Sequence, residues 1–176
     1  PHECSSAASD VYKRQIGESR DQFKPARDAK FRLLCGAAVS VPRTADGFID
    51  YNLLNDHVGE MVDKGLDLVA VSTAHGHALE VGEATNAIRK EFPDLSIMAG
   101  NVTSGEGTEF LAKSGADSIK IGQGPGSICT TRVVAGVGIP QMSALYASSK
   151  IASTYGISLV ADGGITKSGD IVKALT

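Results

Sequence analysis

The chain has 176 residues, of which 42% are apolar, and a formal net charge of −3. This length suits one domain with its own core. The acidic balance argues against a nucleic-acid-binding protein, which needs a basic face. No apolar run approaches the roughly 20 residues of a membrane span, and no stretch resembles a signal peptide. The three cysteines form no metal-type spacing and fit a reduced compartment, so we expect a cytoplasmic protein.

The first 15 residues, PHECSSAASDVYKRQ, show neither helical nor strand periodicity. We interpret residues 1–15 as a non-native leader or a disordered tail. His2 and Cys4 are therefore expected to be solvated and to have no part in a functional site. Residues 16–176 are expected to form the folded domain.

From residue 31 onward one pattern repeats: a short apolar run, a loop that contains glycine, and then an amphipathic stretch. Short, mostly apolar runs are typical of parallel strands that are buried on both faces. The stretches between them carry apolar residues at helical spacing, as in Leu54, Val58, Met61 and Val62. The expected strands are 33–39, 68–71, 95–99, 119–122 and 157–161.

Turn and cap signals separate these units. Gly65 and Gly115 each lie just past a helical pattern, where glycine adopts the left-handed cap conformation. Asp67 and Asp117, just before the next strands, are interpreted as turn residues. Thr103, with Glu106 three residues on, fits a capping box. Pro140 similarly suits the first turn of a helix.

About five consecutive βα units suit either a doubly wound sheet or a (β/α)8 TIM barrel. Residue types that are common in active sites follow almost every expected strand. This favours the barrel, because the carboxyl ends of all its strands lie at one face. An open sheet concentrates ligand contacts at one switch point. We therefore expect an α/β protein with an incomplete TIM barrel. An unclosed barrel exposes strand edges, so the isolated chain is expected to be poorly stable and inactive, and turnover by it would refute this.

Residues 118–132, SIKIGQGPGSICTTR, combine a strand with a glycine-rich loop. Gly122, Gly124 and Gly126 alternate there, so several backbone groups can point at one ligand. The loop matches neither the dinucleotide-binding fingerprint nor the phosphate-binding loop that carries lysine. From these residues alone, Cys129 is either a nucleophile near the end of the loop or a buried structural thiol.

Three other features have weaker functional signals. Cys35 lies in an apolar strand and is expected to be a buried structural thiol. His75 and His77 have no cysteine or carboxylate partner nearby, so local hydrogen bonding is favoured over a metal site. Asp162-Gly163-Gly164 is either a plain turn or a ligand-binding loop.

The segment GPGSICTTRVVAGVGIPQ at 124–141 closely resembles the active-site loop of inosine monophosphate dehydrogenases. Guanosine monophosphate reductases share this loop and its thiol, but the apolar continuation at 133–135 favours the dehydrogenase. The resemblance runs from about residue 17 to residue 176. Four further segments resemble the same family in the same order: GAAV at 36–39, STAHGHA at 72–78, AGNV at 99–102 and ADGGI at 161–165.

The resemblance implies a covalent mechanism. The Cys129 thiolate would add to C2 of the hypoxanthine ring of inosine monophosphate, and hydride would pass to NAD. Activated water would then hydrolyse the covalent intermediate to xanthosine monophosphate. Thr131 matches the threonine that takes part in activating this water.

The resemblance also implies the binding residues. Asp162 would hold the ribose hydroxyls, because a carboxylate accepts hydrogen bonds from both. The carbonyl oxygens of Gly124, Gly126 and Cys129 would bind a potassium ion. The other implied substrate ligands are Ser127, Gly163 and Gly164 near the phosphate, and Asn101 near the base or cofactor. The implied NAD-binding residues are Ser72, Thr73, Ala74, Gly122, Gln123 and Gly124.

Two positions depart from the family pattern: Ser72 replaces an aspartate beside the nicotinamide ribose, and Gln123 replaces an apolar residue. They indicate a divergent paralogue and put the cofactor preference in question. The mobile flap of the family, with its Arg-Tyr pair, and its regulatory module have no counterpart here, so we expect a central fragment of the catalytic barrel. Family members are homotetramers that bind a purine nucleotide, and neither a nucleic acid nor a membrane is an expected partner.

Two alternative functions remain open. The first is a guanosine monophosphate reductase that uses NADPH. The second is a non-catalytic nucleotide-binding paralogue, which the presence of Cys129, Thr131 and Asp162 together argues against.

Overall fold

The computed structural model describes residues 26–28 and 30–176, and the leader expected over residues 1–15 lies outside them. The described residues belong to two compact units, one that ends at Leu34 and one that begins at Cys35. The predicted fold and the predicted site both lie in the second unit.

The first strand is shorter than expected, because it begins at Gly36 rather than at residue 33. Leu33 instead pairs with Arg27 in an isolated antiparallel bridge within the first unit, and its side chain is exposed. The apolar character of Leu33 and Leu34 suggested a strand, but both side chains lack a buried face.

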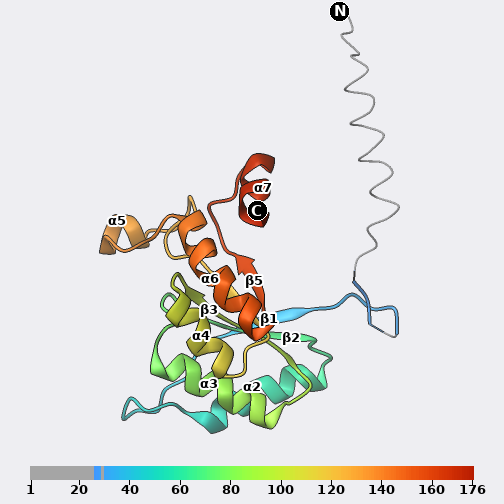
Figure 1. The fold of residues 1–176 in the computed structure, drawn as a ribbon. Coiled ribbons are helices and arrows are strands. Elements are labelled where there is room, and N and C mark those ends of the chain that lie inside the picture. The colour runs from blue at the N-terminus through green and yellow to red at the C-terminus, as the bar shows by residue number, and fades with distance from the viewer. Residues whose placement is uncertain (1–25, 29) are drawn as a thin grey trace, which may run out of the picture. The chain divides into compact units, whose positions relative to one another are not determined.

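The second unit contains a sheet of five parallel strands, which lie side by side in chain order (Figure 1). A doubly wound sheet would reverse direction at a switch point, whereas a barrel adds each strand next to the previous one. The strand order thus agrees with the barrel. The strands are β1 (Gly36–Val39), β2 (Leu68–Ser72), β3 (Ser96–Val102), β4 (Ser118–Ile121) and β5 (Ser158–Ala161).

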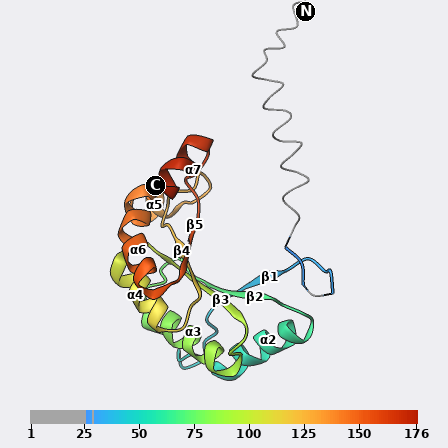
Figure 2. The same ribbon diagram turned by 45° about the vertical axis from the view of Figure 1, so that its right-hand side comes forward.

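The helices follow one another in an arc along the outer side of the curved sheet (Figure 2). Neighbours in this arc pack together in the order α2, α3, α4 and α6. No helix in the described part of the chain is long and apolar enough to cross a membrane. The helices are α2 (Tyr51–Asp63), α3 (Leu79–Glu91), α4 (Gly105–Lys113), α5 (Thr131–Ala135), α6 (Gln141–Tyr155) and α7 (Ser168–Leu175).

The hydrophobic core lies between the sheet and the helices. Alternate residues of a strand point to opposite faces, and in β4 Ile119 and Ile121 are completely buried while Ser118 and Lys120 are only partly buried. The same alternation holds in β2. One face of the sheet therefore builds the core, and the residues between the core positions face the inner side. The other fully buried large apolar core residues are Leu54, Val58, Val69, Val71, Ile88, Ile97, Val102 and Leu111.

In the repeated turns, the glycines have the predicted conformation, whereas the aspartates have a further role that was not predicted. Gly65 and Gly115 have φ values of 93° and 101°, which confirms the left-handed caps. Asp67 and Asp117 do more than form turns. Each Oδ2 accepts a hydrogen bond from a backbone amide at or just before the start of an earlier strand, at 2.8 and 2.7 Å respectively. The two aspartates thus connect successive βα units.

Two helix starts differ slightly from the prediction. Helix α4 is capped by Ser104 rather than Thr103, because the Ser104 hydroxyl accepts the amide hydrogen of Gly107. Pro140 is the cap residue of α6 and lies just before its first turn. Both shifts are a single residue, which leaves the order of elements unchanged.

Cys35 is not the buried thiol that the sequence suggested. It directly precedes β1, is exposed, and its Sγ lies 3.4 Å from the carbonyl oxygen of Gly65. Burial in a strand requires neighbours on the faces of the sheet, and Cys35 lies before the paired part of β1.

Candidate active site

The glycine-rich loop joins β4 to α5, and Cys129 lies near its end. The Cys129 backbone amide donates to the carbonyl oxygen of Gly126 at 3.1 Å, which closes a turn under the thiol. Gly122 has a φ of 140°, and a Cβ there would lie 2.5 Å from the carbonyl oxygen of Asp162. A side chain at position 122 would therefore push apart the ends of β4 and β5.

The Cys129 thiol is half-buried and in contact with Thr131. Its Sγ lies 3.2 Å from the Thr131 Oγ1. This hydroxyl contact is the main cause of a lowered pKa of Cys129, aided by backbone hydrogen bonds from Thr131 and Gly124, while partial burial and, less strongly, the charge of Asp162 oppose the shift. The thiol donates to the hydroxyl when protonated, and the hydroxyl donates to the sulfur when the thiolate forms. The local structure thus favours the nucleophilic form.

Asp162, directly after β5, is the centre of a polar network. Its Oδ2 accepts from Asn101 Nδ2 at 2.7 Å and from Lys120 Nζ at 3.1 Å. Asn101 Nδ2 also donates to the carbonyl oxygen of Gly122 at 2.9 Å. Asn101 first, and then Lys120, lower the pKa of Asp162, so its carboxylate form is favoured. Two residues that the sequence singled out, Asn101 and Asp162, are therefore in direct contact.

Lys120 is the member of this network that sequence reasoning missed. It is the one charged residue in the otherwise apolar and small-residue run of β4. A lysine in a buried strand requires a partner, and this requirement was the available signal.

The residues expected on the cofactor side lie at the ends of β2 and β4. Gln123 Nε2 donates to the carbonyl oxygen of Ala74 at 3.0 Å, and its Oε1 accepts from Thr103 at 3.3 Å. Thr73 is tied to β3 by two backbone hydrogen bonds with Gly100 and Asn101, both of 2.9 Å. Gln123 thus connects three loops that the sequence suggested only as separate segments.

His75 makes a hydrogen-bond contact, as expected, whereas His77 makes an aromatic contact instead. His75 Nδ1 lies 3.1 Å from Gln123 Nε2, and the His77 ring packs against Phe110 at a centroid distance of 5.4 Å. Within residues 26–28 and 30–176, no cluster of three or more His, Cys, Asp or Glu side chains is arranged to hold a metal.

The loop after β5 packs against the cysteine loop. A Cβ at Gly163 would lie 3.1 Å from the Gly126 nitrogen, and a Cβ at Gly164 would lie 2.9 Å from Pro125 Cβ. Ser127 is different: its side chain is exposed and makes no hydrogen bond to a described residue. The structure thus brings Gly163 and Gly164 to the cysteine loop but gives Ser127 no partner within the described chain.

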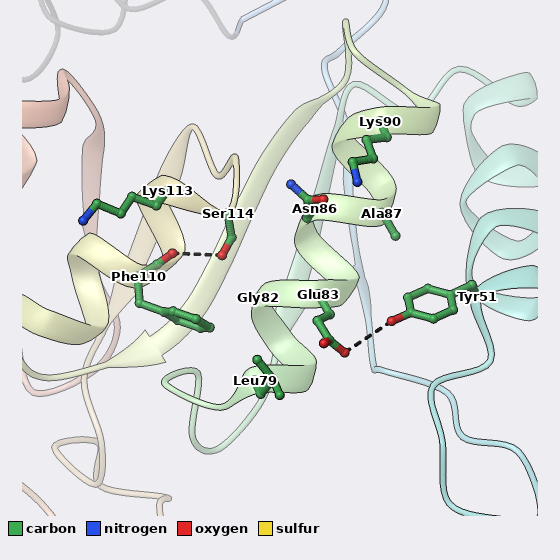
Figure 3. Close-up of a pocket in the computed structure, with 10 residues that line it drawn as sticks. All are labelled: Tyr51, Leu79, Gly82, Glu83, Asn86, Ala87, Lys90, Phe110, Lys113 and Ser114. Carbon is green, nitrogen blue, oxygen red and sulfur yellow. Dashed lines mark hydrogen bonds between the residues drawn. The ribbon is translucent and has the colours of Figure 1, made fainter.

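A separate groove of about 670 Å³ lies on the outer, helical side (Figure 3). Tyr51 of α2 donates to Glu83 of α3 across one part of it at 3.2 Å, and Phe110 of α4 lines another part. None of the residues of the cysteine loop lines this groove. The loop that carries Cys129 and the groove on the helices are therefore separate parts of the structure.

Comparison with known proteins gives a consistent result. The family described as "IMP dehydrogenase / GMP reductase domain" matches residues 6–176. The inosine-5'-monophosphate dehydrogenase of Halalkalibacterium halodurans is 47% identical over 150 residues, and that of Aquifex aeolicus is 47% identical over 149 residues. Each match covers 85% of this chain but only 29% of the relative, so the chain spans less than a third of their length.

A solved structure is similar as well. The crystal structure of a GMP reductase variant from Trypanosoma brucei, in complex with guanosine 5'-monophosphate, superposes with a TM-score of 0.76 at 39% sequence identity. The match covers 91% of this chain and 32% of that one, and it confirms the expected fold as part of a TIM barrel. The family match extends over the strands, the cysteine loop and the loop of Asp162. The chain belongs to the IMP dehydrogenase / GMP reductase family.

Proposed function

We propose that this chain carries the catalytic cysteine of an enzyme that oxidises inosine 5'-monophosphate to xanthosine 5'-monophosphate. The observation that carries the proposal is the contact of Cys129 with Thr131 in a glycine-rich loop that packs on the loop of Asp162. The identity of 47% to two dehydrogenases supports this choice of reaction.

Cys129 is the nucleophile in this proposal. Its thiolate adds to C2 of the purine, and the resulting covalent intermediate is hydrolysed after hydride has left, which regenerates the thiolate. The Thr131 hydroxyl, 3.2 Å from the sulfur, stabilises the thiolate and is close enough to take part in proton transfer during hydrolysis. Dividing the reaction into two steps replaces one difficult displacement by two easier ones.

The nucleotide would bind across the two loops. The Asp162 carboxylate, ionised because Asn101 and Lys120 contact it, would accept hydrogen bonds from the ribose hydroxyls. The main chain of Gly163 and Gly164 would approach the phosphate, with the exposed Ser127 hydroxyl as a further donor.

The cofactor in this proposal is NAD, which when bound supplies the acceptor for the hydride. The polar groups at the ends of β2 and β4 fit a nicotinamide ribose and its amide, since they include the hydroxyls of Ser72 and Thr73 and the amide of Gln123. The remaining residues proposed on this side contribute backbone alone: Ala74, Gly122 and Gly124.

A potassium ion also fits the cysteine loop. Among the described residues, none donates a hydrogen bond to the carbonyl oxygens of Gly124 or Cys129, and the Cys129 amide alone donates to the Gly126 carbonyl. Carbonyl oxygens in a loop of this kind are suitable ligands for a hard monovalent cation. The ion would hold the loop in the shape that presents the thiol. The full-length enzyme is proposed to be a cytoplasmic homotetramer.

A GMP reductase is the second candidate, because the similar solved structure is a GMP reductase with guanosine 5'-monophosphate bound. In that case the same thiol would act on C2 of guanine, with NADPH as the hydride donor. Cys129, Thr131 and Asp162 would keep their roles, so the two candidates differ in substrate and not in site.

Mass spectrometry of an acid-quenched reaction tests the proposal. The full-length gene product is mixed with inosine monophosphate, NAD and potassium, and the peptide that contains Cys129 is examined for a purine adduct. An adduct that is absent from the Cys129→Ala variant supports the dehydrogenase. An adduct formed only from guanosine monophosphate indicates the reductase, and no adduct from either nucleotide refutes both in favour of a non-catalytic paralogue.

A further inference from the structure

Lys120 lies in a row of residues that crosses four strands on the inner face of the sheet. In register, Ser72 of β2 is next to Gly100 of β3, Gly100 is next to Lys120 of β4, and Lys120 is next to Val160 of β5. The neighbours of Lys120 within β4, Ile119 and Ile121, point the other way into the core. The lysine therefore reaches the inner face from a fixed strand position and not from a loop.

Gly100 provides the space for this lysine. A Cβ at Gly100 would lie 2.7 Å from the Lys120 Cβ and 2.7 Å from its carbonyl oxygen. Ser72 and Lys120 are two strands apart, or about 10 Å between backbones. Because Gly100 has no side chain, Lys120 Nζ crosses this gap and lies 3.3 Å from the Ser72 Oγ.

The same ammonium group contacts Asp162 on its other side. Nζ lies 3.1 Å from Oδ2, the oxygen that also accepts from Asn101. No described residue donates to the other oxygen, Oδ1. Two donors on one oxygen fix the rotation of a carboxylate, because it cannot turn without breaking both hydrogen bonds.

We propose that Lys120 is a positioning residue for the nucleotide: it holds Asp162 so that Oδ1 is presented to the ribose hydroxyls. Lys120 itself does not touch the substrate in this arrangement. Through Ser72 it also links the carboxylate to the strand end on the proposed cofactor side. The inference rests on the proposed function, since it assigns Asp162 to the ribose.

The proposal predicts a specific kinetic signature. Lys120→Met keeps the length of the side chain but removes its charge, so the KM and the Kd for the nucleotide should rise about tenfold. The kcat should change less than about twofold, because binding of the ground state and the transition state weakens equally. Lys120→Arg keeps a charged donor and should recover most of the affinity.

The test uses the full-length gene product with inosine and guanosine monophosphate as probes, titrated by calorimetry and in steady-state assays. Lys113→Met is the matched control, because Lys113 forms an ion pair of 2.7 Å with Glu109 on the outer surface of α4. It should leave the affinity unchanged. Thermal unfolding of each variant shows whether the fold is intact.

A double-mutant cycle with Asp162→Asn separates positioning from general structural support. If Lys120 acts through Asp162, Lys120→Met should cause no further loss in the Asp162→Asn background. A full tenfold loss in that background, or wild-type affinity in Lys120→Met alone, overturns the inference while the proposed function stands. If neither nucleotide binds the wild-type protein, the proposed function itself fails.

Discussion

The outer and inner faces of strand β4 differ in chemistry within four residues. Ile119 and Ile121 have no exposed surface and pack beneath the helices, whereas Lys120 between them reaches the inner face and contacts Asp162. Alternation along the strand places these neighbours on opposite sides. One short strand therefore contributes to the core and to the site, and the two contributions can be removed separately.

This comparison predicts that the effect of a substitution depends on the face of the sheet on which the residue lies. Changes on the outer face should reduce stability, and changes at the inner face or at the strand ends should reduce binding or chemistry in a folded protein. The largest effect is expected where the proposed covalent bond forms.

Cys129→Ala should reduce turnover by about 10⁴-fold or more, because it removes the thiol that forms the proposed covalent intermediate. The measurement is steady-state turnover of the full-length gene product, with thermal unfolding to show an intact fold. Cys35→Ala is the control, since this exposed thiol lies outside the site and its removal should leave turnover unchanged. Substantial activity in Cys129→Ala would remove the cysteine from the mechanism.

Ile119→Ala should reduce stability. We expect a loss of roughly 2–5 kcal/mol in the free energy of unfolding, because the substitution leaves a cavity between the sheet and the helices. Urea unfolding of the full-length protein measures it. Ile128→Ala removes the same atoms from a side chain that is 95% exposed and should cost less than about 0.5 kcal/mol. Equal losses in the two variants would contradict the assignment of the core to the outer face.

Thr131→Val should change the pH at which the Cys129 thiol ionises, although it leaves the thiol itself in place. The Thr131 hydroxyl is the main cause of the lowered pKa of Cys129, so its removal should raise that pKa. Alkylation by iodoacetamide requires the thiolate, and its rate rises with pH through the pKa. The profile should therefore move to higher pH in Thr131→Val and stay in place in Thr130→Val. A profile identical to the wild type would show that the hydroxyl contact does not govern the thiol.

Gln123→Leu should have the smallest effect. It removes the hydrogen bonds to Ala74 and Thr103 that join three loops, but it leaves the backbone of the cysteine loop unchanged. The KM for NAD should rise about threefold with little change in the KM for the nucleotide. Thr103→Val removes only one of these bonds and should give a smaller change. A change confined to the nucleotide KM would place Gln123 on the substrate side.

Local sequence patterns were sufficient for most of the fold. The apolar runs and helical periodicity gave five strands in the correct order, and glycines such as Gly65 and Gly115 marked the turns, because these signals act over a few residues. Where the pattern was ambiguous, as at Leu33 and Cys35, an apolar run was extended beyond the paired strand. Strand pairing, which no local signal measures, sets the residue at which the strand begins.

The sequence by itself also determined the cysteine loop and the closeness of Cys129 to Thr131, because the two residues are separated by one position in a turn. Only the tertiary structure decided that Lys120 contacts Ser72 and Asp162, which lie 48 and 42 positions away from it in the chain. It likewise decided that Asn101 and Asp162, 61 positions apart, share a hydrogen bond. Such contacts depend on strand register and on the space left by Gly100, and both are properties of the assembled sheet.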